Sequence, residues 1–100
     1  MVSLYNIRLD RYEKNALLHA LNGVDDEVYV FGSRLDSKKR GGDIDLVVFS
    51  KQNSFVLSRQ IAQRFFIHCE EKIDVLVFDR DNLSDEQNAF LATLQLTKIQ

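Results

Sequence analysis

The sequence lacks several features that would assign it to a specialised class of protein. It has a single cysteine, Cys69, so no disulfide can form within the chain and we expect a reducing, cytoplasmic compartment. No apolar run approaches the ~20 residues of a membrane span, and the first residues lack the layout of a signal peptide. The net charge of −2 argues against a general nucleic-acid-binding protein, which usually carries a strong basic excess.

Length and composition predict one small globular domain over residues 1–100. Hydrophobic residues make up 45% of the chain and charged residues 28%, which is ordinary for a globular protein that buries one core. The sequence contains no internal repeat, low-complexity segment or interdomain linker, so we expect no second domain in it.

The hydrophobic periodicity predicts the element order α-β-β-α-β-α. The expected elements are a helix from Asp10 to about Leu21, strands at Val28–Phe31, Asp43–Phe49 and Ile73–Phe78, and helices from Asn53 or Ser54 to about Ile67 and from Ser84 toward the chain end. The fold class is therefore α/β (α+β), with a small mixed sheet of three or more strands flanked by helices. The short loop between the first two strands predicts an antiparallel pair, and the helical crossover to the third predicts a parallel one.

The expected last helix is apolar on two sides. One stripe contains Phe90, Leu91 and Leu94, and we expect it to cover the sheet. A second stripe contains Ala89, Ala92, Leu96 and Ile99. This second stripe is either part of a broad core contact or an exposed surface for a homo- or hetero-oligomer.

The residues with the clearest chemical meaning lie around the first two strands. The first strand ends in Gly32-Ser33, and the second opens with Asp43 and Asp45, which point to one face because strand residues alternate. Two carboxylates held together repel each other unless a proton or a cation lies between them, and such oxygen ligands suit Mg²⁺. The Gly-Ser step offers amides and a hydroxyl to an anion.

The loop between these strands is basic. It carries Arg34, Lys38, Lys39 and Arg40 beside the expected phosphate position. One or two of these side chains could steady a triphosphate or the leaving pyrophosphate, while a solvated, flexible loop is the alternative for each of them.

A third aspartate, Asp74, interrupts the otherwise apolar strand Ile73–Phe78. A carboxylate in such a strand is costly unless it is paired or functional. If this strand lies parallel to the second, Asp74 starts its strand beside Asp43 and Asp45, and the three carboxylates converge at one edge of the sheet. Metal-binding carboxylates beside a phosphate site are what phosphoryl or nucleotidyl transfer requires.

The run Gly32-Ser33, Asp43-Ile44-Asp45 and later Asp74 resembles the nucleotidyltransferase superfamily of DNA polymerase beta. Within it, the chain resembles the minimal nucleotidyltransferases over nearly its whole length. The resemblance implies the nucleotidyltransferase fold, with Gly32 and Ser33 holding the nucleoside triphosphate and Asp43 and Asp45 binding the metals. Asp74 would be the third carboxylate, which helps to activate the attacking hydroxyl.

The resemblance also implies a partner and a cellular role. Minimal nucleotidyltransferases are often paired with a HEPN-domain protein, many of which are RNase toxins, and some neutralise that toxin by transferring AMP from ATP to it. The expected function is thus Mg²⁺-dependent transfer of AMP from ATP to a hydroxyl of a HEPN-type toxin, through a two-metal site. The alternatives are a nucleotide-binding antitoxin that neutralises its partner by contact alone, and transfer to RNA or a small molecule.

Overall fold

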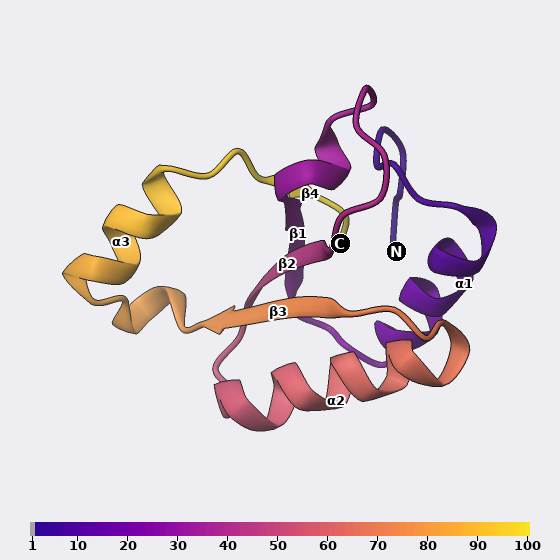
Figure 1. The fold of residues 1–100 in the computed structure, drawn as a ribbon. Coiled ribbons are helices and arrows are strands. Elements are labelled where there is room, and N and C mark those ends of the chain that lie inside the picture. Colours follow the sequence, from indigo (N-terminus) through magenta and orange to yellow (C-terminus); the bar gives the residue numbers. More distant parts are fainter. Residues whose placement is uncertain (1) are drawn as a thin grey trace.

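The computed structural model describes residues 2–100 and confirms an α+β fold with a mixed sheet (Figure 1). Its elements are α1 (Arg11–Ala20), β1 (Glu27–Phe31), the 3₁₀ turn η1 (Gly32–Leu35), β2 (Ile44–Phe49), α2 (Ser54–His68), β3 (Ile73–Phe78), the 3₁₀ turn η2 (Arg80–Asn82), α3 (Asp85–Ala92) and β4 (Thr97–Lys98). No helix in the described part of the chain is both long and apolar enough to cross a membrane.

Local sequence explains where the helices begin. Asp10 and Glu13 form a capping box at α1, in which each side chain accepts a hydrogen bond from the other's backbone N–H at 2.8 Å. Ser84 and Gln87 form a second capping box at α3, and Asn53 caps α2 through the backbone N–H of Val56. Each cap satisfies a helix-end N–H that has no partner inside the helix.

The four strands are arranged in the order β3-β2-β1-β4. β1 and β2 are antiparallel, and β2 and β3 are parallel with α2 as the crossover, so both predicted pairings are confirmed. The parallel pairing brings the beginnings of β2 and β3 together, beside the end of β1. This is the edge of the sheet where the sequence predicts a site.

The two faces of the sheet differ in how they are covered. The helices α1 and α2 pack on one face, where Val28 and Val30 of β1 are fully buried together with Leu17, Ile61 and Phe65. The alternate residues of β1 are only partly buried, and Tyr29 packs edge-on against Phe49 of β2 with ring centroids 5.6 Å apart. We call this second side, on which neither α1 nor α2 packs, the open face.

The prediction for the last helix is wrong. α3 ends at Ala92, none of its residues is buried, and Figure 1 shows it projecting from the end of β3. The chain then turns back and forms β4, which pairs antiparallel with β1. The predicted second stripe is therefore not one helical surface, because Leu96 and Ile99 lie beyond the helix and Ile99 is a core residue, 2% exposed. Apolar spacing alone does not distinguish a short buried strand from a continued helix.

This placement predicts that the chain end stabilises the whole fold. Ile99→Ala should lower the free energy of unfolding by about 2–5 kcal/mol, since it removes a buried side chain and leaves a cavity. Ile67→Ala makes the same chemical change at a residue that is 72% exposed, and it should change stability by no more than about 0.5 kcal/mol. Urea denaturation of both variants measures the difference, and equal costs would contradict the assignment of Ile99 to the core.

Candidate active site

The strand register places two of the predicted aspartates side by side. Asp45 of β2 is the direct neighbour of Asp74 of β3, and Asp43 lies immediately before β2. Both Asp45 and Asp74 are partly exposed and stand on the strand positions that alternate with the buried Ile44 and Ile73. The carboxylates therefore gather on the open face, as the sequence predicts.

These carboxylates perturb one another. Burial and the negative charges of Asp74 and Asp43 raise the pKa of the Asp45 carboxyl above its ordinary value. Lys72 partly offsets this charge, since its ammonium nitrogen lies 3.7 Å from Asp74 Oδ1 and 3.9 Å from Asp43 Oδ2. The three carboxylates give this site a negative charge that the single Lys72 ammonium does not balance, so the site is suited to bind a cation. No local motif in the sequence distinguishes Lys72.

Gly32 and Ser33 lie against the same site, at the start of η1. Gly32 has φ +81°, and a Cβ on it would lie 2.6 Å from Asp45 Oδ2. Gly42 has φ +86°, and a Cβ there would lie 2.5 Å from Ser33 Oγ. Both positions need glycine, because the backbone conformation is left-handed and the side-chain oxygens approach closely. The Gly-Ser step and the Asp-x-Asp strand are thus in direct contact, although ten residues separate Ser33 from Asp43.

Arg34 is held in the interior of the molecule. Its guanidinium donates to both carboxylate oxygens of Glu13, at 2.9 and 2.6 Å, and also to the backbone oxygens of Arg8 and Gly42. The Arg34 and Glu13 side chains are only 7% and 4% exposed. The contact with Gly42 connects this buried pair to the residue before Asp43. Phosphate binding by Arg34 stays a prediction. The ion pair with Glu13 disfavours it, because the guanidinium is already bound to a carboxylate.

Arg8 supports the loop from outside. It donates to the backbone oxygens of Gly41 at 2.6 Å, Asp36 at 3.1 Å and Ser33 at 3.3 Å. Together, Arg8 and Arg34 bind the backbone at both ends of the loop between β1 and β2. Sequence reasoning missed this role of Arg8 and Glu13, because their partners are carbonyl groups and a distant arginine that no spacing rule identifies.

Two cavities adjoin the loop, one on each side. A cavity of about 570 Å³ opens beside Gly32 and is lined by Ser37 and Lys38 of the loop and by Thr93 and Gln95 from the segment between α3 and β4. A second, of about 430 Å³, contains the predicted basic residues Lys39 and Arg40. Both volumes are within the range of small-molecule sites. A further cavity, of about 590 Å³, lies at the other end of the sheet around Lys51 and Arg80.

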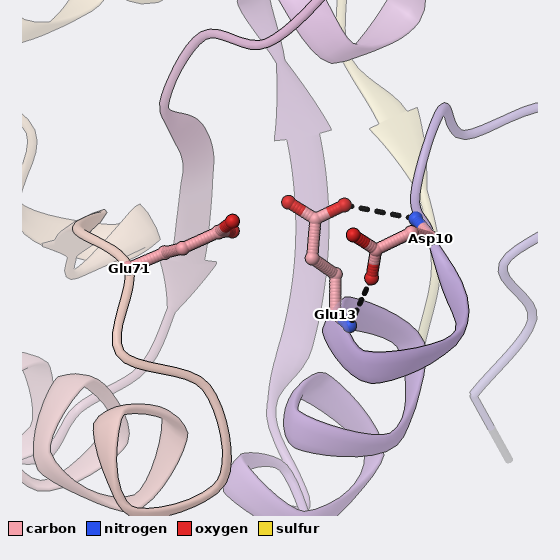
Figure 2. A group of neighbouring side chains, drawn as sticks. All are labelled: Asp10, Glu13 and Glu71. Carbon is pink, nitrogen blue, oxygen red and sulfur yellow. Dashed lines mark hydrogen bonds between the residues drawn. The ribbon is translucent and has the colours of Figure 1, made fainter.

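A second acidic cluster lies at the start of α1. Asp10, Glu13 and Glu71 are the one group of three in residues 2–100 whose possible metal-ligand atoms all lie within 4.8 Å of one another, so the three predicted aspartates form a looser set (Figure 2). Burial raises the pKa of Glu13, but the hydrogen bonds and charge of Arg34, the neighbouring Glu71 and the backbone N–H of Asp10 together outweigh it and lower the value to about 2. The neighbouring Glu13 carboxylate, together with burial, raises the pKa of Glu71. Arg34 thus already supplies the positive charge here, and the cluster serves the α1 cap and the loop.

Comparison with known families agrees with the geometry. The family model described as a nucleotidyltransferase domain matches residues 13–90, which include Gly32, Asp43, Asp45 and Asp74. No curated protein matches the chain.

Because Gly32 lies against Asp45, adding a side chain at position 32 should lower the free energy of unfolding. Gly32→Ala should destabilise the protein more than Gly23→Ala, because Gly23 has φ +85° with no atom within 4 Å of a Cβ, whereas Gly32 also meets Asp45. The backbone strain of about 1–2 kcal/mol is common to both variants. The difference in unfolding free energy therefore measures the clash with Asp45. Equal costs would mean that Asp45 is not packed against Gly32.

The buried ion pair predicts a pH-dependent stability. Glu13→Gln keeps the shape and the cap but leaves Arg34 without a counter-charge, so it should cost about 3–5 kcal/mol at neutral pH. An unfolded glutamate titrates near ~4.3, and the folded Glu13 near about 2. The stabilisation is thus complete above the unfolded value and is lost as the pH falls toward 2.

The matched control is Glu27→Gln, which removes a carboxylate that is bound to Arg80 and Lys98 at the surface. This variant should change stability little, because solvent screens exposed pairs. Denaturation curves of both variants between pH 7 and pH 3 test the prediction. A cost for Glu13→Gln that did not shrink with falling pH would contradict it.

Proposed function

Because this chain belongs to the nucleotidyltransferase-domain family, whose members transfer nucleoside monophosphates from nucleoside triphosphates, we propose that it moves AMP from ATP onto a hydroxyl of a partner protein. The observation that carries the proposal is the pairing of Asp45 with Asp74 across β2 and β3, directly against Gly32. It combines clustered carboxylates with the glycine-serine turn that approaches a phosphate chain.

The carboxylates supply the charge that a divalent cation requires. Burial, and after it the charges of Asp74 and Asp43, raise the pKa of Asp45, and the Lys72 ammonium lies between Asp43 and Asp74. These clustered carboxylate oxygens are a donor set that fits Mg²⁺. Two Mg²⁺ ions bound by Asp43, Asp45 and Asp74 would supply Lewis-acid charge that lowers the pKa of the attacking hydroxyl and neutralises the triphosphate.

The triphosphate lies against η1 in this proposal. Gly32 has no side chain to obstruct the phosphates, and Ser33 offers a hydroxyl. The cavity beside Gly32 receives the rest of the nucleotide, with Lys38 available to the phosphate oxygens and Gln95 to polar groups of the base or ribose. Lys39 and Arg40, which line the second cavity, bind the leaving pyrophosphate in this proposal.

In the transfer step, the acceptor oxygen attacks the α-phosphorus of ATP, and the bond to the bridging oxygen of the pyrophosphate breaks. The proton of the acceptor hydroxyl passes to a carboxylate oxygen of Asp74. This residue suits that role because it stands on a different strand from Asp43 and Asp45 and is partly exposed. AMP remains on the acceptor, and pyrophosphate leaves.

The acceptor is a HEPN-type toxin in this proposal, and the chain acts as its antitoxin. The support is the resemblance to minimal nucleotidyltransferases that act on such partners, together with a net charge of −2 that does not favour RNA as an acceptor. Transfer to RNA or to a small molecule is the weaker alternative.

Asp74→Asn tests the catalytic role. Asparagine has nearly the same size but cannot accept the proton, so transfer should fall by about 10²–10⁴-fold while ATP binding remains. The measurement is intact-mass spectrometry of a co-expressed HEPN protein after incubation with Mg²⁺ and ATP, where each transfer adds one AMP. Asp25→Asn, an exposed change before β1, is the control and should transfer at the wild-type rate.

A toxicity rescue assay distinguishes transfer from neutralisation by contact. If the wild type rescues growth fully while its partner gains no mass, the protein acts by contact and the enzymatic proposal is wrong. If Asp74→Asn transfers AMP as fast as the wild type, the reaction is real but Asp74 is not its proton acceptor.

A further inference from the structure

Tertiary packing brings the two histidines of the chain together. His19 lies in the last turn of α1 and His68 is the last residue of α2, and these two helices pack side by side (Figure 1). The centroids of the two imidazole rings are 4.0 Å apart, and the ring planes are inclined at 66°. The sequence contains no other histidine, so all of its imidazole groups lie at this one place. The pair belongs to the helices, which cover the sheet face opposite the aspartates.

The helix backbones that carry the two rings are held in position. Leu17 and Phe65, on the facing sides of α1 and α2, are fully buried in the core. Arg64 of α2 also donates a hydrogen bond of 2.9 Å to the backbone oxygen of Asn22, just beyond the end of α1. The two histidine side chains themselves are exposed. Their rings can therefore reorient while the distance between the two helices stays fixed.

The separation of the rings suits a shared metal ion. Imidazole nitrogen is a preferred ligand of Zn²⁺ and of the neighbouring divalent transition metals. With zinc–nitrogen distances of about 2.0–2.1 Å and a roughly tetrahedral angle, the centroids of two ligating rings lie about 5 Å apart. The rings observed at 4.0 Å need to separate by only about 1 Å, which small changes in the χ angles of two exposed side chains provide.

The helix ends favour a cation at this place. The last carbonyl groups of a helix have no partner within it, and they give its C-terminus a partial negative charge. Because His19 and His68 each lie in a last turn, two negative helix ends meet at the pair. Arg64, one turn before His68, opposes this effect only in part, since its guanidinium is bound to the Asn22 carbonyl.

Cys69 follows His68 but is a poor candidate for a third ligand. Burial, and after it the charge and hydrogen bonding of Glu71, raise the pKa of the Cys69 thiol to about 11. A thiol binds zinc as its thiolate, which this environment disfavours. Two imidazole nitrogens and water molecules are therefore the ligands that the described residues offer.

We propose that His19 and His68 form a binding site for a divalent transition metal ion, Zn²⁺ or one of its neighbours, that links the end of α1 to the end of α2. Water completes the coordination of the ion. The nitrogen ligands distinguish this site from the carboxylates of the candidate active site, which suit Mg²⁺. The bound ion stabilises the packing of α1, the helix whose Glu13 holds Arg34. This proposal does not depend on the proposed nucleotidyl transfer.

Long-range ¹H–¹⁵N NMR spectra of the histidine side chains test the site directly. When Zn²⁺ is added to the full chain without an affinity tag, the nitrogen signals of both imidazoles should shift together and reach saturation at the same Zn²⁺ concentration. The shifts should persist in Asp43→Asn/Asp45→Asn, which removes two carboxylates that could also bind zinc. Mg²⁺ should leave both imidazoles unchanged, because it prefers oxygen ligands.

Single substitutions test whether both rings bind one ion. In the Asp43→Asn/Asp45→Asn background, His19→Gln and His68→Gln should each weaken Zn²⁺ binding by roughly 10-fold or more, since the second ligand no longer binds within the same molecule. Calorimetric titration measures the affinities, and circular dichroism checks that the variants are folded. Cys69→Ser is the matched control at the neighbouring residue and should bind Zn²⁺ as tightly as its parent. Unshifted imidazoles, a shift of only one ring, unchanged affinity in either glutamine variant, or loss of binding in Cys69→Ser would each overturn the proposal.

Discussion

The buried pair between Arg34 and Glu13 is the contact on which the geometry of the candidate site depends. It joins the capping box of α1 to η1 and, through Gly42, to the residue before Asp43. A buried charge without its partner lowers the free energy of unfolding, so substituting either residue alone should destabilise the fold. The pair therefore makes the position of the aspartates depend on the position of α1, which lies more than twenty residues earlier in the chain.

Close approach of like charges is the second constraint. Asp45 is packed between Gly32 and Asp74 while Asp43 lies nearby, and only the exposed Lys72 offsets the charge. The surrounding structure maintains this arrangement, since the parallel β2–β3 pairing sets the spacing of the carboxylates. In the proposed reaction, a divalent cation at these residues offsets the repulsion, so its binding should stabilise the fold.

The sheet is completed unevenly. α1 and α2 cover one face, whereas the open face contains the aspartates and borders a cavity built from η1 and the segment after α3. No residue of α3 is buried, so this helix leaves the face open to ligands. The candidate site thus lies on the side of the sheet that α1 and α2 leave uncovered.

The sequence by itself determined α1, α2, the first three strands and their pairings, because periodicity, caps and loop length are local signals. Those pairings in turn bring Asp45 beside Asp74. The sequence could not determine the end of the chain, since Leu96 and Ile99 have a spacing that suits a helix and a returning strand equally well. Nor could it separate Arg34 from Lys39 and Arg40. All three are basic residues of one loop, and only tertiary packing placed Arg34 against Glu13 and left the other two at the surface, because burying a guanidinium requires a paired carboxylate, and here that carboxylate, Glu13, stands 21 residues earlier in the chain.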